Sequence, residues 1–318
     1  MIKKIVSVAL PIGENLIIQK NRIMQEKTAK NAQRISIVTG IHGDELEGQY
    51  VCYELTRRIN LNLENLTGIV DIYPALNPLG IDAGNRYVPK SDMDMNRMFP
   101  GSENGTVMEK VAASVIDDLI GSDFCIDVHA SDLFVKELPQ VRLSEDYAEK
   151  LLPYSKMMNV DMVWMNATAT VHESTLAHSL NMLGVPTLVV EMGLGKKINR
   201  AYGNQIVDGI LNLMYEIGLW KQKIDNIKEP VISKNGQVEF LRASATGVFI
   251  PLIEHNHYVK AGQKIGEIVN VLKGTIEEEI VAGEDGLVFT LREYPMVYEG
   301  ALLGRILIGI KKNKEDIQ

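Results

Sequence analysis

Four residues of this sequence have side chains and positions suited to a metal-dependent active site. His42 and Glu45 lie three residues apart in the turn GIHGDE, directly after a short β-branched run. His129 and Glu191 come at the ends of two further apolar runs. Imidazole and carboxylate are ligands that zinc accepts, and a catalytic zinc keeps three protein ligands and one open position. This count favours His42, Glu45 and His129 as ligands and leaves Glu191 as a general base.

The runs that precede these residues have the pattern of buried strands. Residues 35–38, 124–128 and 187–190 are apolar and too short for helices. Because parallel strands bring their carboxyl ends to one edge of a sheet, where ligands bind, the four side chains should converge there. Any one of them alone would more simply be a buried polar group bonded within the core.

Strand and helix patterns alternate through about residue 225. This predicts an α/β fold with a largely parallel sheet flanked by helices. Apolar residues at helical spacing predict helices within 51–59, 107–119, 176–183 and 206–217, and acidic residues in a first turn predict a helix over 144–154. Helical patterns stop after Lys228-Glu229-Pro230, so we expect a catalytic domain over 1–228 and a small all-β domain over 229–318.

The expected C-terminal domain has the rhythm of a barrel-sandwich. Residues 247–269 and 281–289 resemble the biotinyl and lipoyl carrier domains, which present a modifiable lysine at a hairpin tip. The nearest candidate, Lys273, stands before Gly274 with a different flank and spacing, so we expect this shape without a prosthetic group. His255-Asn256-His257 is expected to be a solvent-facing turn, with a second metal site as the alternative.

Composition narrows the class of protein further. The chain has 318 residues, of which 46% are hydrophobic and 23% charged, as in ordinary globular proteins. A net charge of −8 argues against nucleic acid or an anionic membrane as the main partner. Two cysteines make no disulfide framework, which favours the cytoplasm. No run approaches the ~18 apolar residues of a membrane span, and residues 1–13 are expected to form a strand and a turn rather than a signal peptide.

The motifs also occur in the order of a known family. They are GIHGDE, Asn77-Pro78 with Gly80, Asp94-Met95-Asn96-Arg97, Asp127-Val128-His129 and Glu191-Met192-Gly193. Over nearly the whole chain the sequence resembles the succinylglutamate desuccinylase/aspartoacylase family, a branch of the zinc carboxypeptidase fold. The resemblance implies one zinc ion per chain on His42, Glu45 and His129, with Glu191 as base and proton shuttle.

The same resemblance assigns residues to the substrate. Asn96 and Arg97 would hold the α-carboxylate of the substrate, and Arg86 would polarise the scissile carbonyl and stabilise the oxyanion. A surface ion pair on a loop is the alternative for both arginines. Asp127 either orients a ligand histidine or is a core polar group bonded to backbone.

The sequence departs from the family in one segment that matters for specificity. No arginine stands just before Glu191 to bind a distal carboxylate of the acyl chain. Lys196, Lys197 and Arg200 follow Glu191 and could supply positive charge instead, although a solvated basic face is the simpler interpretation. A tyrosine of the C-terminal domain could also enter the site, and Tyr294 and Tyr298 are the candidates.

We therefore expect a cytoplasmic zinc-dependent amidohydrolase. It would cleave the amide bond of an N-acyl amino acid or a related small amide that bears a carboxylate. One alternative is a metallocarboxypeptidase that uses the same site on peptide C-termini. The other is a non-catalytic ligand-binding or carrier protein, with Lys273 as the attachment point. Nothing in the sequence decides whether the chain forms a homo-oligomer.

Overall fold

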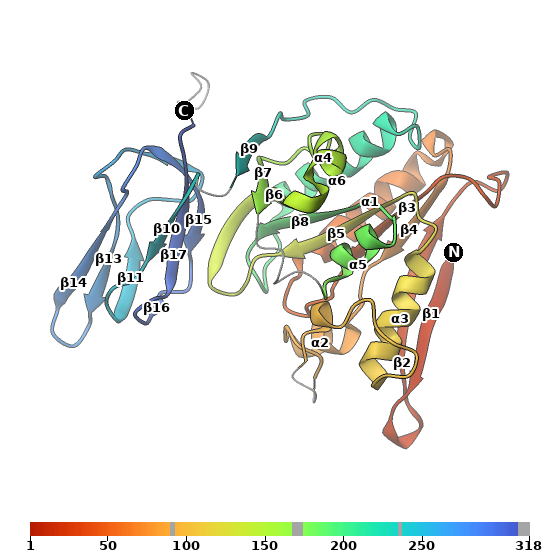
Figure 1. Ribbon diagram of the computed structural model, residues 1–318, viewed down its shortest axis with the longest axis horizontal. Coiled ribbons are helices and arrows are strands. Elements are labelled where there is room, and N and C mark those ends of the chain that lie inside the picture. Colours follow the sequence, from red (N-terminus) through yellow and green to blue (C-terminus); the bar gives the residue numbers. More distant parts are fainter. Residues whose placement is uncertain (90–92, 167–173, 235–236, 311–318) are drawn as a thin grey trace.

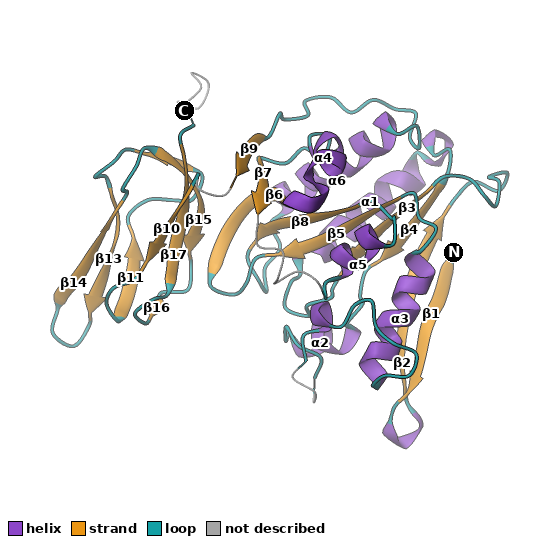
Figure 2. Ribbon diagram, viewed as in Figure 1, coloured by secondary structure: helices purple, strands orange, loops and turns teal. Residues whose placement is uncertain are grey.

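The computed structural model describes residues 1–89, 93–166, 174–234 and 237–310. An α/β core fills one side of the molecule and a region built of strands fills the other (Figures 1 and 2). We call residues 237–310, which hold β10 to β17, the C-terminal β region. The first 13 residues form a strand and a short turn of 3₁₀ helix, as the sequence predicted.

The strands of the described residues are β1 (Ile2–Ala9), β2 (Asn15–Ile23), β3 (Arg34–Thr39), β4 (Ile69–Tyr73), β5 (Phe124–Ala130), β6 (Val135–Ser144), β7 (Met162–Asn166), β8 (Thr187–Gly193), β9 (Val231–Lys234), β10 (Val238–Arg242), β11 (Gly247–Pro251), β12 (His257–Val259), β13 (Lys264–Asn270), β14 (Thr275–Val281), β15 (Gly286–Arg292), β16 (Met296–Val297) and β17 (Leu302–Ile308).

The α-helices are α1 (Glu47–Leu61), α2 (Pro78–Ala83), α3 (Val107–Leu119), α4 (Glu145–Ser155), α5 (Leu176–Met182) and α6 (Arg200–Glu216), and the 3₁₀ helices are η1 (Pro11–Gly13), η2 (Leu63–Asn65) and η3 (Met95–Arg97). All five helices expected from the sequence are present as α1, α3, α4, α5 and α6. Thr106 begins α3 with the capping box that it forms with Glu109.

Successive side chains of the central strands point to opposite faces of the sheet. Ile126 and Val128 of β5 therefore pack on one face with apolar residues of α1 and α6. Cys125, the residue before Ile126, points the other way and packs on the opposite face with residues of α3 and α5. Both faces are thus covered, which explains the nearly continuous apolar runs of these strands.

The sheet is mixed, whereas the sequence predicted a largely parallel one. Its order runs β1-β2-β4-β3-β5-β8-β6-β15-β17-β10 in the described residues, with parallel pairing among β4, β3, β5 and β8. β1 and β2 pair antiparallel because a short connection joins them, and β2 pairs antiparallel to β4. β6 follows β5 after residues 131–134, too few for a crossover helix, and pairs antiparallel to β8.

β6 joins the two parts of the molecule. Its second half pairs in parallel with β7, which pairs with β9, and its first half pairs antiparallel with β15 of the C-terminal β region. A second sheet, β14-β13-β11-β16, packs around a separate apolar core that includes Phe249 and Ile268. Among described residues, those from 237 on contain strands and turns and no helix, as expected. No helix in the described part of the chain is long and apolar enough to span a membrane.

Candidate active site

The turn between β3 and α1 brings His42 and Glu45 to the carboxyl edge of the sheet, where both are buried. Gly43 lies between them and packs directly on the backbone of α2: a Cβ atom at this position would be 1.9 Å from the carbonyl carbon of Gly80. Gly80 in turn packs on the side chain of Asn77, whose Oδ1 accepts from the Gly80 N–H. The glycines of the GIHGDE turn and of the Asn77-Pro78-Leu79-Gly80 segment are therefore needed for close packing beneath the site.

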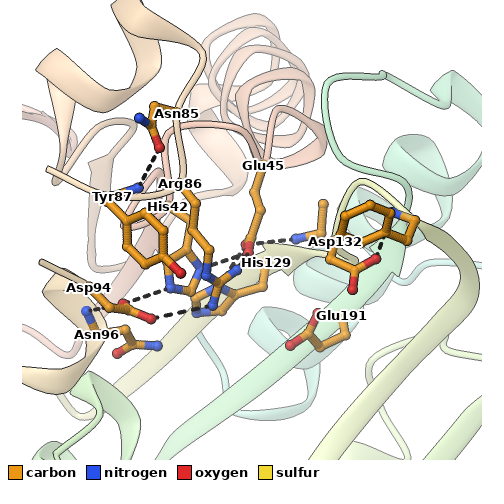
Figure 3. Close-up of polar contacts among 12 residues, drawn as sticks. His42, Glu45, Asn85, Arg86, Tyr87, Asp94, Asn96, His129, Asp132 and Glu191 are labelled. Atoms are coloured by element: carbon orange, nitrogen blue, oxygen red, sulfur yellow. Dashed lines mark hydrogen bonds and ion pairs between the residues drawn. The ribbon is translucent and has the colours of Figure 1, made fainter. Parts of the chain in front are cut away.

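Glu45 lies between the two histidines. Its Oε1 is 2.6 Å from Nδ1 of His42, and its Oε2 is 2.9 Å from Nδ1 of His129, which the neighbouring strand β5 presents. The Ala130 N–H also donates to Oε2. The ligand atoms of His42, Glu45 and His129 all lie within 4.8 Å of one another, so the structure brings the three predicted ligands together (Figure 3).

Each histidine has a carboxylate behind it. Nε2 of His42 is 3.0 Å from Asp94 Oδ1, and Nε2 of His129 is 3.1 Å from Asp127 Oδ2. The second contact is an ion-pair distance without good hydrogen-bond geometry, and both atoms lack another partner. Both Nδ1 atoms therefore face inward and both Nε2 atoms face a carboxylate, which is the usual arrangement of metal-binding histidines. The geometry favours the orienting role for Asp127.

The charges of this cluster are unbalanced. Three carboxylates, of Glu45, Asp94 and Asp127, surround the histidines. Among the described residues, the permanent cation that pairs with this group is Arg86, 3.0 Å from Glu45 and 3.5 Å from Asp94. Burial opposes the charging of His42, but the hydrogen bonds that its ring donates to Asp94 and Glu45 outweigh the effect of burial and raise the pKa of His42. The same balance, with Asp127 and Glu45, raises the pKa of His129 well above its ordinary range. This donor set, two imidazoles and a carboxylate short of positive charge, fits a divalent cation.

Glu191 lies beside the cluster at the end of β8, on the side of His129 away from Asp94 (Figure 3). Pairing of β5 with β8 places His129 opposite Glu191 in register. Burial raises the pKa of Glu191 to about 7, against the opposing effect of Arg142. A carboxylate with a pKa near neutrality is suited to exchanging protons at physiological pH.

A cavity of about 940 Å³ opens over the cluster and Glu191. Arg86, Asn96 and Arg97 line it together with the cluster. Asn96 is buried and accepts from the Leu176 N–H, while Arg97 is exposed and donates to the Asn96 carbonyl. All seven residues proposed from the sequence for the site thus border one space, whose volume suits a small molecule.

The cavity is also lined by two arginines that were not predicted from the sequence. Arg142 of β6 donates to Glu191 Oε1 at 3.2 Å, and Arg305 comes from β17 of the C-terminal β region. Both contact the buried carboxylate of Glu137. The charged residues of the run KELPQVR were visible in the sequence. Without knowledge of the strands that pair with β6, however, the sequence did not tell which of these side chains would face the cavity.

Other candidates lie elsewhere. Lys196, Lys197 and Arg200 do not line the described cavity, and neither do Tyr294 and Tyr298. The second metal site at residues 255–257 is not supported, because His255 hydrogen-bonds to the hydroxyl of Tyr202 at 2.6 Å. Among described residues, His42, Glu45 and His129 are the one group of at least three ligating side chains with suitable spacing.

Comparison with solved structures defines the class of fold. The product-bound ectoine utilization protein EutE (DoeB) from Ruegeria pomeroyi superposes with a TM-score of 0.81 at 21% identity, covering 96% of this chain and 93% of that one. A succinylglutamate desuccinylase/aspartoacylase from Rhodobacter sphaeroides gives 0.78 at 21% identity, covering 92% and 90%. At these identities the likeness is one of fold.

Sequence comparison then defines the family. The family model of the succinylglutamate desuccinylase/aspartoacylase catalytic domain matches residues 31–217. The chain belongs to the succinylglutamate desuccinylase/aspartoacylase family. A stretch of 101 residues is also 36% identical to the N-alpha-acetyl-L-2,4-diaminobutyric acid deacetylase of Halomonas elongata, and it covers 31% of this chain and 29% of that relative.

Proposed function

We propose that this protein is a zinc-dependent amidohydrolase that removes the acyl group from an N-acyl amino acid or a related small amide. The observation that carries the proposal is the buried His42, Glu45 and His129 cluster beside Glu191 in one cavity. Membership of the desuccinylase/aspartoacylase family supports the reaction class. The partial match to a deacetylase of an N-acetylated amino acid supports the substrate class.

His42, Glu45 and His129 would hold one zinc ion per chain through Nδ1, a carboxylate oxygen and Nδ1. When bound, zinc supplies Lewis acidity to a water molecule and to the amide carbonyl. Asp94 and Asp127 keep the two imidazoles in orientation and increase their basicity as ligands.

Glu191 is the proposed base. It takes the proton of the attacking water and delivers it to the nitrogen of the leaving amine, so one group serves both steps. Arg86 stabilises the negative charge that develops on the carbonyl oxygen, and its place beside Glu45 supports this role. Asn96 and Arg97 bind the α-carboxylate of the substrate, and the exposed guanidinium of Arg97 supports that assignment.

Three broader assignments belong to the same proposal. The part over residues 1–228 would share the zinc carboxypeptidase architecture, with residues 229–318 as a second domain joined to it by the continuous sheet. The barrel-sandwich shape of the second domain would carry no prosthetic group. Cys52 and Cys125 are both buried and free, which supports a reducing compartment such as the cytoplasm.

Metal content and hydrolysis test the proposal together. Elemental analysis should find about one zinc per chain in the wild type and none in His42→Ala. A panel of N-acyl amino acids should yield at least one substrate, and Glu191→Gln should retain zinc while losing about 10²–10⁴-fold in rate. Wild-type protein that neither contains nor regains zinc would refute the assignment.

The same assays separate the alternatives. A metallocarboxypeptidase would cleave longer peptides at least as well as N-acyl amino acids. A carrier protein would keep its function in Glu191→Gln and would show a mass increase on the peptide that contains Lys273.

A further inference from the structure

A chain of alternating charges connects the C-terminal β region with Glu191. Glu137 of β6 is only 1% exposed, and its two carboxylate oxygens have different partners. Oε1 accepts from Arg305 Nη1 and lies 3.3 Å from the Thr290 hydroxyl, whereas Oε2 accepts from Arg142 Nη2 at 2.7 Å. The other terminal nitrogen of Arg142 donates to Glu191. The order is thus Arg305, Glu137, Arg142, Glu191.

The backbone supports this order strand by strand. Arg305 of β17 pairs with Thr290 of β15, and Thr290 pairs with Glu137 of β6. A few residues along β6, Gln140 pairs with Glu191 of β8. One continuous sheet therefore fixes both ends of the charge chain, and the pairing of β6 with β8 shifts register between Glu137 and Gln140.

Aromatic rings hold both guanidinium groups in place. The Cζ atoms of Arg142 and Arg305 lie 5.7 and 5.5 Å from the ring centre of Trp164, and Arg305 also lies 5.7 Å from that of Phe240. Contacts of this kind restrict the plane of a guanidinium as well as its distance. Arg142 therefore has little freedom to change partner while Arg305 is present.

The role of Arg305 follows from the requirement that a buried carboxylate be paired. Without Arg305, Arg142 would be the remaining cation that pairs with Glu137 in the described part of the chain, and the most favourable pairing of arginine with carboxylate is bidentate. Arg142 would then turn both terminal nitrogens to Glu137 and leave Glu191. Arg305 satisfies one oxygen of Glu137, so Arg142 keeps one nitrogen for Glu191.

We propose that Arg305 of the C-terminal β region is a positioning residue that holds Glu191 in place through Glu137 and Arg142. This inference rests on the proposed function, in which Glu191 is the general base. It makes the C-terminal β region a part of the catalytic machinery and not only a neighbour of the cavity.

A double-mutant cycle on Arg142 and Arg305 tests the proposal. Arg305→Met keeps the apolar stem that packs on Trp164 and Phe240 but removes the charge. It should lower kcat about 10–100-fold through misplacement of Glu191, with KM changed less than about twofold. Since Arg305 acts through Arg142, the double variant should be no slower than Arg142→Met alone. Losses that multiply would overturn the proposal.

Two variants complete the cycle. Arg305→Lys should recover most of the rate, because Arg305 uses a single terminal nitrogen on Glu137 and an ammonium can replace it. A lysine variant as slow as Arg305→Met, with zinc content intact, would contradict the charge chain. Arg242→Ala is the matched control: this exposed arginine on β10 donates to the Gly300 carbonyl and should leave kcat unchanged.

A crystal structure of Arg305→Met gives a readout that needs no activity. The contact between Arg142 and Glu191 should be lost and the arrangement of His42, Glu45 and His129 retained. A retained contact would overturn the inference even if the wild type is active. An inactive wild type in which the contact depends on Arg305 would instead count against the proposed function alone.

Discussion

Two buried clusters of charge sit on the same central sheet, and they differ in how their charges are balanced. In the first, the Lys20 cluster, Lys20 lies 3.0 Å from Asp71 and 2.6 Å from Asp118, and Arg22 binds Asp71 through two hydrogen bonds of 2.7 and 2.5 Å. In the second, the cluster of His42, Glu45 and His129, three carboxylates surround the histidines, and Arg86 is the permanent cation in the described residues that pairs with two of them, Glu45 and Asp94.

The difference separates a structural cluster from a site that is suited to binding a cation. Asp71 is fully buried, and hydrogen bonds from Arg22 and Lys20 overcome the effect of burial and lower its pKa. Its charge is satisfied by side chains alone, so nothing further is needed. The histidine cluster can be neutral only if both imidazoles take protons or a divalent cation replaces those protons. Burial of charge alone is therefore no sign of a metal site, but a deficit of positive charge around inward-facing ligands is.

The largest expected effect is on the Lys20 cluster. Lys20→Met leaves two carboxylates without their shared cation and should lower the free energy of unfolding by about 3–5 kcal/mol. Urea unfolding measures this loss, and zinc content should stay at the wild-type value. Lys4→Met on the exposed side of the same hairpin is the control, expected within about 0.5 kcal/mol of the wild type. An equal loss of unfolding free energy in Lys20→Met and Lys4→Met would show that the Lys20 cluster has no special role in stability.

Zinc should stabilise the folded protein through the second cluster only. At a free concentration of 100 times Kd, binding to the folded state adds about 2.7 kcal/mol. Thermal unfolding with and without zinc should show this gain in the wild type and in Lys20→Met, and none in His42→Ala. A gain of equal size in His42→Ala would mean that zinc binds elsewhere.

Two aspartates sharpen the comparison further. Asp94 contacts His42 as Asp118 contacts Lys20, but of the two aspartates Asp94 is the one that contacts a proposed metal ligand. Asp94→Asn should weaken zinc binding about 10–100-fold, measured by competition with a chelator of known affinity. Asp118→Asn should leave zinc affinity unchanged and lower stability instead. Equal zinc affinity in the two variants would argue against the orienting role of Asp94.

The smallest effects are on the pH dependence of stability in the metal-free protein. A rise in pH should weaken the stabilising contribution of the histidine cluster and strengthen that of the Lys20 cluster. Because the pKa values of His42 and His129 are raised on folding, their contribution is complete below about pH 6.5 and is lost as pH rises through the raised values. Because the pKa of Asp71 is lowered, its contribution is present above about pH 3.9 and is lost on acidification.

Urea midpoints measured with a chelator across this range test both signs. His129→Gln should flatten the fall in stability on the alkaline side and leave the acid limb unchanged. Saturating zinc should reverse the alkaline trend, since deprotonated histidines bind the metal more tightly. An alkaline limb that His129→Gln does not alter would show that other groups titrate there.

The sequence allowed the histidine cluster to be predicted because each ligand follows directly from a local pattern. His42, Glu45, His129 and Glu191 all come at the ends of apolar runs. Parallel strands bring these ends to one edge of the sheet, so the four side chains meet there. The helices were equally accessible, since their apolar faces repeat within a few turns. Arg142 and Arg305 were not, because their meeting depends on pairing between strands more than 140 residues apart in the chain.

The mixed character of the sheet was missed for a related reason. The run VKELPQVRLS contains a proline and several charges, so its composition does not mark a strand in the middle of a sheet. β6 tolerates Pro139 at the register shift between Glu137 and Gln140, where the ladder with β8 is interrupted. Such a strand is recognisable only once its neighbours are known.

The shared strand β6 also has a consequence for synthesis of the chain. One edge of its first half stays open until β15 pairs with residues 135–137, and β15 begins only at Gly286. A nascent chain on the ribosome therefore carries an unpaired strand edge next to the candidate active site until about 150 further residues have been added. Such a long-range closure slows folding and leaves time for wrong pairing, so efficient production of this protein should depend on chaperones that shield that edge.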